Sequence, residues 1–166
     1  MKTELRQRLA AECIGTAFLL ATVVGSGIMG ERLAGGNVGL ALLANSVATG
    51  AILWALILTL EPLSAHFNPV VTLCEAASRR LPWAHVPPYL LAQLAGAFLG
   101  VGTANLMFGL PCFSASHHVR SGLSQCFSEG VATFGLVLII FTCARLRPKA
   151  VPTAVAAYIT AAYWFT

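Results

Sequence analysis

Five long apolar stretches constrain the fold of this chain more than any other feature of its sequence. They cover about residues 9–28, 40–60, 89–110, 126–144 and 150–166. A helix needs roughly 20 apolar residues to cross a hydrocarbon core about 30 Å thick. Backbone groups find no water to bond inside a bilayer, so helices are the expected form of such stretches. The pattern predicts an all-α, polytopic transmembrane helix bundle with about five spanning helices.

The composition agrees with a membrane location. Hydrophobic residues make up 57% of the 166 residues and charged residues only 10%, whereas soluble domains carry roughly 25% charged residues. The mean hydropathy is +0.78. The first apolar stretch follows basic residues as a signal peptide does, but its length and its Glu12 favour a retained span. The ten basic residues are spread thinly along the chain, which argues against a nucleic-acid partner.

The basic residues are distributed unevenly between the two ends of the predicted spans. If the N-terminus is cytoplasmic, only Arg32 and Arg120 lie outside. The basic residues inside are then Lys2, Arg6, Arg8, Arg79, Arg80, Arg145, Arg147 and Lys149. Because basic loops remain in the cytoplasm, this distribution predicts a multi-pass protein of the cell membrane with a cytoplasmic N-terminus.

Two apolar stretches begin alike, with "AECIGTAFLL" and "SEGVATFGLV", so that Glu12 aligns with Glu129 and Thr16 with Thr133. Acidic residues are costly in apolar helices, so their alignment is informative. Three predicted crossings separate the two copies, which predicts an inverted repeat. We expect Glu12 and Glu129 to be structural intramembrane acids that accept hydrogen bonds from buried loop backbone. The alternative is that each merely lies near a helix N-terminus, where the helix dipole favours an anion.

The segment "LSAHFNPVV" lies between two spans and is followed by an apolar run too short to cross. Asparagine is a favoured helix N-cap and proline a favoured first helical residue, so Asn68 and Pro69 predict a half-helix of about ten residues. With its carbonyl oxygen capping the helix, Asn68 keeps its NH2 free to donate to a passing oxygen. The segment is expected to enter the membrane and line a water-filled path. The alternative is an ordinary Asn-Pro turn outside the membrane.

No catalytic or metal-binding pattern is evident. The five cysteines have no metal-ligand spacing, and we interpret them as small buried hydrophobic residues. Cys112 and Cys126 flank a loop with His117 and His118, which leaves a disulfide or a metal site as a less favoured alternative to a solvated loop. An intramembrane enzyme would need more than His66 or Cys74, and the spans lack the charges of an ion-coupled transporter. We predict no enzyme, no cofactor and no metal.

Taken together, these motifs resemble the aquaporin or major intrinsic protein family over nearly the whole chain. "AECIGTAFLL" is similar to the family's first helix, "HFNPVVTL" to its first pore loop, "YLLAQLAGAFLG" to its third helix and "SEGVATFGLV" to its fourth. The resemblance implies six spanning helices, two half-helices that meet at mid-membrane, and a homo-oligomer, namely a tetramer with one pore in each subunit. Gly96 and Gly100 form a GxxxG pair suited to close helix packing.

The resemblance also implies roles for single residues. Asn68 would be the pore asparagine, Pro69 and Val70 would complete its motif, and His66 would line the pore or pack beside it. Gln93 is expected to pack or to hydrogen-bond outside the pore. The constriction position on the second span falls at Ala48 or Thr49, and either small residue would widen the filter. This favours passive movement of water and small neutral solutes, such as polyols or undissociated metalloid hydroxides.

The repeat also predicts features that the 166 residues do not include. Glu12 and Asn68 are 56 positions apart, so a second Asn-Pro is expected 56 positions after Glu129, near residue 185. We divide the single transmembrane domain, 1–166, into a first repeat at 1–110, an extracytoplasmic connecting loop at 111–125 and a partial second repeat at 126–166. The chain is expected to be truncated and impaired as a channel when alone. The alternative is a non-conducting subunit that assembles with a full-length relative.

Overall fold

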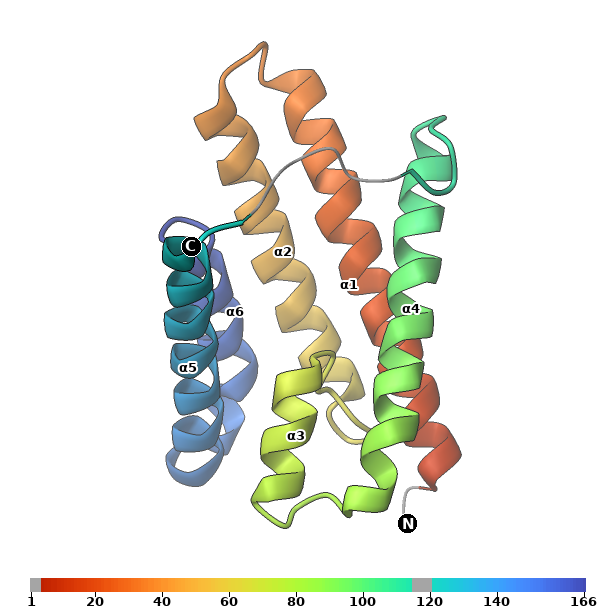
Figure 1. Cartoon of the computed structure of the whole chain (residues 1–166), viewed down its shortest axis with the longest axis vertical. Coiled ribbons are helices and arrows are strands. Elements are labelled where there is room, and N and C mark those ends of the chain that lie inside the picture. The colour runs from red at the N-terminus through yellow and green to blue at the C-terminus, as the bar shows by residue number, and fades with distance from the viewer. Residues whose placement is uncertain (1–3, 115–120) are drawn as a thin grey trace.

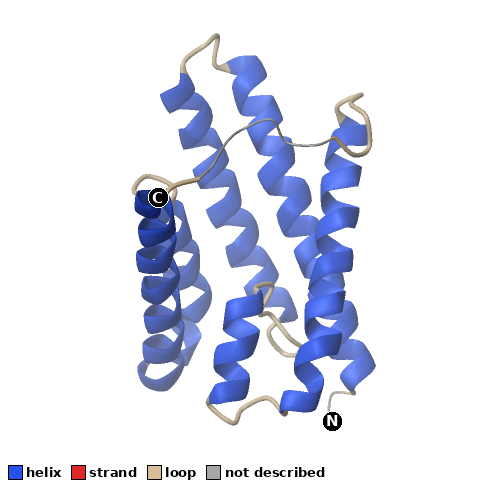
Figure 2. Ribbon diagram, in the orientation of Figure 1, coloured by secondary structure: helices blue, strands red, loops and turns tan. Residues whose placement is uncertain are grey.

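The computed structural model describes residues 4–114 and 121–166, and this part of the chain is helical without a strand (Figures 1 and 2). The α-helices are α1 (Leu5–Leu33), α2 (Val38–Leu60), α3 (Pro69–Ala77), α4 (Val86–Met107), α5 (Leu123–Leu146) and α6 (Val151–Ala162). Short 3-10 helices, η1 (Trp83–His85) and η2 (Pro148–Ala150), precede α4 and α6.

Among the residues that the structure describes, four helical segments are long and apolar enough to cross a bilayer. They are Leu5–Leu33, Val38–Leu60, Trp83–Met107 and Leu123–Leu146. This confirms the predicted all-α transmembrane bundle. The fifth predicted span differs, because α6 has 12 residues, fewer than the roughly 20 needed to cross. Pro148 and Pro152 restrict where this helix begins, and the chain turns after Ala162.

The helices α1 and α4 lie side by side along most of their length (Figure 1). Their close approach depends on glycine. A Cβ atom added at Gly96 would collide with the carbonyl oxygen of Cys13, and one at Gly100 with that of Ala17. At one end of the pair, the guanidinium of Arg32 donates a 3.0 Å hydrogen bond to the carbonyl of Phe108 and lies 5.1 Å from its ring centroid. The GxxxG pair therefore faces α1 directly.

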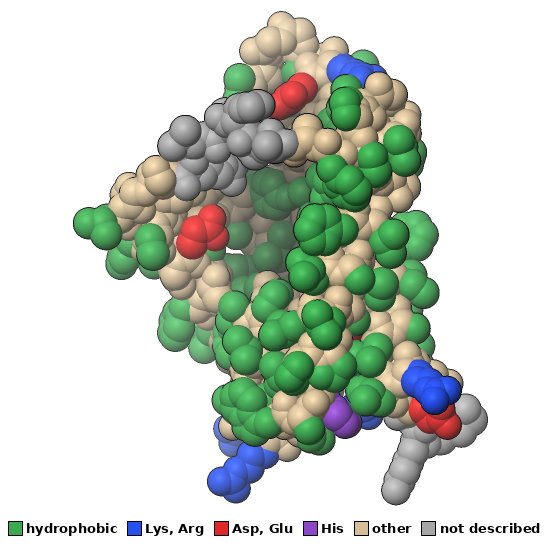
Figure 3. Space-filling model, turned by 45° about the vertical axis from the view of Figure 1, so that its right-hand side comes forward, with side chains coloured by type: hydrophobic (Ala, Val, Ile, Leu, Met, Phe, Trp, Pro, Cys, Tyr) green, Lys and Arg blue, Asp and Glu red, His purple; other side chains and the backbone are tan. Residues whose placement is uncertain are grey.

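The second group of helices is formed by α5 and α6, and α6 packs against α2. A hydrophobic core of six buried side chains lies where α2, α5 and α6 meet the start of α3 and the segment before it: Leu56, Ile57, Phe67, Val71, Leu136 and Val155. Large apolar side chains also cover the outer surface, where hydrophobic residues dominate the middle of the molecule (Figure 3). An apolar exterior of this extent is the surface expected next to lipid.

The half-helix α3 begins near the middle of the bundle and runs toward the end where the N-terminus lies (Figure 1). Asn68 is its N-cap, and its side-chain oxygen accepts hydrogen bonds from the backbone N–H groups of Val70 at 2.8 Å and Val71 at 3.4 Å. Pro69 occupies the first helical position, where a missing N–H costs nothing. The positive end of the α3 dipole is thereby held inside the bundle.

Candidate functional site

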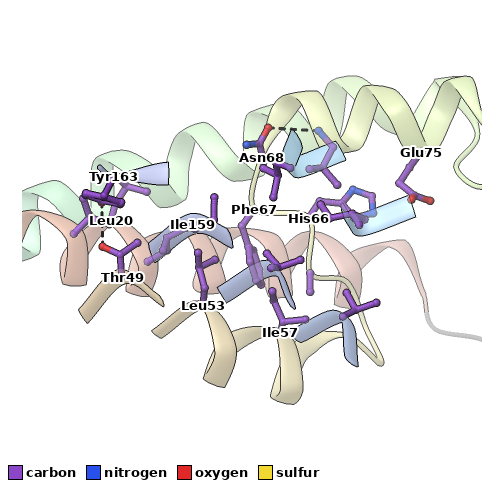
Figure 4. A pocket seen from close by; sticks show the side chains of 18 residues that line it. Leu20, Thr49, Leu53, Ile57, His66, Phe67, Asn68, Glu75, Ile159 and Tyr163 are labelled. Carbon is purple, nitrogen blue, oxygen red and sulfur yellow. Dashed lines mark hydrogen bonds between the residues drawn. The ribbon is translucent and has the colours of Figure 1, made fainter. Parts of the chain in front are cut away.

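A cavity of about 270 Å³ lies between the start of α3 and helices α1, α2, α5 and α6. Figure 4 shows His66 and Glu75 at one end, Thr49 and Tyr163 at the other, and Asn68 between them. The remaining lining residues are mostly aliphatic: Leu19, Leu20, Val23, Leu53, Ile57, Ala65, Phe67, Val71, Leu136, Ile140, Val151, Val155 and Ile159. The cavity therefore has apolar walls with polar groups at a few positions.

A buried carboxylate holds the segment that precedes α3. Glu12 is 0% exposed and its two oxygens accept four hydrogen bonds. One oxygen receives the hydroxyl of Ser64 at 2.6 Å and the backbone N–H of His66 at 2.8 Å. The other receives the backbone N–H of Phe67 and the side-chain amide of Gln93, both at 2.8 Å. These bonds satisfy backbone donors that have no helical partner and no access to water.

The backbone at Phe67 needs this support. Its φ of 48° lies in the left-handed region, which is unfavourable for a residue with a bulky side chain. Its ring is buried against α1, where any side chain at Gly15 would collide with it. The glycine on α1 and the carboxylate of Glu12 thus allow a strained turn that places Asn68 immediately after it.

Thr72, on the first turn of α3, connects the pore segment to α4. Its hydroxyl oxygen accepts from the side-chain amide of Gln93 at 3.0 Å and lies 3.1 Å from the carbonyl oxygen of Asn68. It also lies 3.1 Å from Nδ1 of His66. Gln93 is only 4% exposed and bonds both Glu12 and Thr72. Its contacts join three elements around the N-cap.

His66 lies in the segment between α2 and α3, outside the four spanning helices. Burial lowers the pKa of its imidazole below 6.5, and the nearby carboxylates of Glu12 and Glu75 oppose this effect only in part. The centroid of the His66 ring lies 5.2 Å from that of Tyr89 on α4, which packs it against the wall.

At the other end of the cavity, α6 is hydrogen-bonded to α2. The hydroxyls of Thr49 and Tyr163 lie 3.0 Å apart. The indole N–H of Trp164, the residue after Tyr163, donates a 3.3 Å hydrogen bond to the hydroxyl of Ser46, about one helical turn before Thr49 on α2. These two hydrogen bonds attach the end of α6 to α2.

The structure brings only part of the predicted pore set to the cavity. Asn68, His66 and Thr49 line it, whereas Pro69, Val70 and Ala48 are not among the lining residues. Pro69 and Val70 belong to the first turn of α3, and the side chain of Val70 is 38% exposed. Of the two candidate positions on α2, Thr49 is the one that lines the cavity.

The two aligned glutamates have different surroundings, since Glu12 is buried while Glu129 is exposed on α5. Sequence reasoning missed Tyr163 and Glu75 as lining residues. For Glu75 the sequence did offer a signal, because it lies about two helical turns after Asn68 and therefore on the same face of α3.

The cysteines are all free thiols. His117 and His118, considered with Cys112 and Cys126 as a possible metal site, lie outside the described residues, as do Lys2 and Arg120. Within residues 4–114 and 121–166, no group of three or more histidine, cysteine or acidic residues is placed to hold a metal ion.

Comparison with known proteins identifies a family that the sequence matches. The sequence matches the family described as "Major intrinsic protein" over residues 1–164. It is 52% identical over 164 residues to "Aquaglyceroporin AqpS" of Rhizobium meliloti (strain 1021), which covers 98% of this chain and 70% of that protein. It is 34% identical over 137 residues to "Nodulin-26" of Glycine max and 33% identical over 137 residues to "Aquaporin NIP1-1" of Oryza sativa subsp. japonica. Each match covers 81% of this chain, which spans 49% and 47% of those relatives.

Proposed function

Because this chain belongs to the major intrinsic protein family, whose members are channels and not enzymes, we propose that it forms a path for water and small neutral solutes across a bilayer. The observation that carries the proposal is the cavity that extends from His66 past Asn68 to Thr49 and Tyr163 (Figure 4). Its polar groups are few and lie at intervals along apolar walls. Such a path guides a solute without binding it tightly.

The charge arrangement supports neutral solutes. The α3 dipole places up to about half a positive charge at its N-terminus, beside Asn68, which opposes entry of cations. The side-chain oxygen of Asn68 is occupied by the backbone of α3, so its NH2 group is the part that donates to a passing oxygen. Water and hydroxylated solutes have the acceptor that this donor requires.

The solute range is proposed to extend beyond water. Thr49 is a small residue at one end of the cavity, and a small side chain leaves room for a polyol or an undissociated metalloid hydroxide. The similarity to a protein named an aquaglyceroporin supports this proposal.

We further propose that the protein lies in the cell membrane with its N-terminus in the cytoplasm. Basic residues of the described chain gather near the end that includes the N-terminus, as the lower part of Figure 3 shows. They come from the start of α1, the segment after α3 and the end of α5: Arg6, Arg8, Arg79, Arg80, Arg145, Arg147 and Lys149. Arg32 lies at the opposite end of α1. The positive-inside rule supports this orientation.

We propose that the working form is a homo-oligomer, with the tetramer of the family resemblance as its expected size. Assembly of this chain with a full-length relative is the second candidate, and the exposure of α5 favours it. Leu136 is the only buried residue of α5, whereas the equivalent repeat helix α1 packs along α4. A spanning helix with one buried residue has most of its surface available to another helix.

Reconstitution into proteoliposomes tests the channel proposal. Vesicles with the 166-residue chain should shrink faster than empty vesicles in a sucrose gradient, and should admit glycerol. Asn68→Asp should abolish both effects, because aspartate still caps α3 but replaces the donor NH2 with a second acceptor and adds a charge. Matched recovery and elution of both proteins in detergent is the control. Shrinkage at the rate of empty vesicles would reject the proposal for this chain and favour the non-conducting subunit.

A further inference from the structure

We infer that Asn45 is a positioning residue that sets the direction of the hydrogen bond between Thr49 and Tyr163. The cavity then ends in a hydrogen-bond acceptor that selects solutes with donor groups. This inference rests on the proposed function for its solute class, but the hydrogen-bond direction itself does not depend on conduction.

The orientation of Asn45 follows from its contact with α1. Its side-chain nitrogen lies 3.1 Å from the carbonyl oxygen of Val23. A carbonyl only accepts, so the NH2 end of the amide must face Val23 and the oxygen must face the other way. That oxygen lies 3.4 Å from the hydroxyl of Thr49, one helical turn further along α2.

The orientation of Asn45 then determines the direction of the hydrogen bonds of Thr49. Its hydroxyl has one proton, and the amide oxygen of Asn45 accepts but cannot donate. With its proton directed to Asn45, Thr49 meets the phenol of Tyr163, 3.0 Å away, only as an acceptor. The proton between Thr49 and Tyr163 therefore comes from Tyr163.

The phenol oxygen of Tyr163 is left with lone pairs and no free proton. Because Tyr163 lines the cavity, these lone pairs are the polar feature that it offers to a solute. Asn68, further along the same cavity, offers a donor. An acceptor at Tyr163 followed by a donor at Asn68 suits a hydroxyl group, which both donates and accepts. A group that only accepts finds no partner at Tyr163, and a cation finds no acceptor at the Asn68 NH2.

Ultraviolet resonance Raman spectroscopy tests the direction in the full chain. Tyrosine has a Raman doublet whose intensity ratio differs between donating and accepting phenols. The chain has three tyrosines, so subtracting the spectrum of Tyr163→Phe isolates Tyr163. In the unaltered protein we expect the doublet intensity ratio of a donating phenol, called the donor ratio below; the ratio of an accepting phenol is the acceptor ratio. An acceptor ratio there would overturn the inference without any further variant.

Substitution of Asn45 tests its part. In Asn45→Leu, which is similar in size but has no amide, Thr49 regains the freedom to donate, and the Tyr163 ratio should shift toward the acceptor value. Ser46→Ala is the matched control, because it removes a hydrogen bond between the same helices through Trp164, outside the cavity lining. It should leave the Tyr163 ratio unchanged.

An unchanged ratio in Asn45→Leu would overturn the role of Asn45. If that variant does not fold, Thr49→Val, which removes the acceptor, should also abolish the donor ratio, and its failure to do so would overturn the inference.

Glycerol entry tests the consequence for selection. Tyr163→Phe removes the acceptor, and glycerol permeability relative to water should fall roughly three- to tenfold, the effect of losing one hydrogen bond. A donor ratio in a chain that does not conduct would reject the proposed function but retain the hydrogen-bond direction. Conduction with an acceptor ratio, or with an unchanged glycerol-to-water ratio in Tyr163→Phe, would reject this inference and retain the channel.

Discussion

At the scale of single residues, Glu12 determines whether the cavity has its shape. The carboxylate of Glu12 accepts hydrogen bonds from the segment before α3 and from Gln93 on α4, and the backbone N–H groups of His66 and Phe67 bond to it rather than to a helical partner. Removing an acceptor from such a group leaves buried donors unsatisfied, which costs more than the hydrogen bond itself contributes. The strained backbone at Phe67 makes this segment especially dependent on Glu12.

The two aligned glutamates provide a matched pair for testing this role. Glu12→Gln replaces one accepting oxygen with an NH2 that faces other donors, so it should lower the free energy of unfolding by about 2 to 4 kcal/mol. Glu129→Gln, at an exposed position of α5, should change it by less than about 0.5 kcal/mol. Thermal unfolding in detergent measures both. Equal shifts in the two variants would contradict the structural role given to Glu12.

At the scale of elements, glycine decides how closely α1 and α4 approach. Small residues at such an interface let backbones touch, which is a main source of helix association in a bilayer. The half-helix α3 depends on this pair, because Glu12 comes from α1 and Gln93 from α4.

Gly96→Ala should separate α1 from α4, since the added Cβ would meet the carbonyl of Cys13. We expect a loss of about 1 to 3 kcal/mol in unfolding free energy, as for overpacking in a core. Gly130→Ala is the control, because a Cβ at Gly130 meets nothing within 4 Å and alanine favours a helix by about 1 kcal/mol. The thermal unfolding temperatures of the two variants, measured in the same detergent without denaturant, should therefore shift in opposite directions. A stabilising effect at Gly96 would mean that the interface is looser than the structure indicates.

At the scale of the whole molecule, the ends of the bundle differ in charge, and this difference gives the basis for its orientation. The basic residues near the N-terminal end come from three separate segments, so no single loop determines the balance. The exposed apolar surface and the hollow between the two groups of helices are properties of the assembled helices (Figure 3).

Cys126 tests the proposed orientation. It is exposed at the start of α5, whereas Cys143 lies near the end of that helix, at the side of the basic residues. In a Cys112→Ser background, which removes the other thiol on that side, a membrane-impermeant maleimide added to intact cells should label Cys126, and the labelling should disappear when Cys126→Ser is added. Cys143 should react only after the membrane is opened. Labelling of Cys143 in intact cells would indicate the opposite orientation.

Local features of the sequence were enough to determine several elements. Long apolar stretches can cross a bilayer only as helices, so four spans were predictable, and Asn68 followed by Pro69 has a strong preference for a helix start, so α3 was predictable as well. The length of α6 was not, because composition alone does not distinguish an apolar helix from an apolar turn after Ala162.

The tertiary structure alone decided which side chains meet. The donors around Glu12 come from positions 52 to 81 residues away, and Tyr163 reaches Thr49 across 114 positions. Hydropathy and capping preferences act over a few neighbouring residues and carry no information about such distant pairs. Tyr163 follows a short helix and becomes part of the cavity only because α6 packs against α2. The role of Tyr163 and the orientation imposed by Asn45 therefore depend on the tertiary structure.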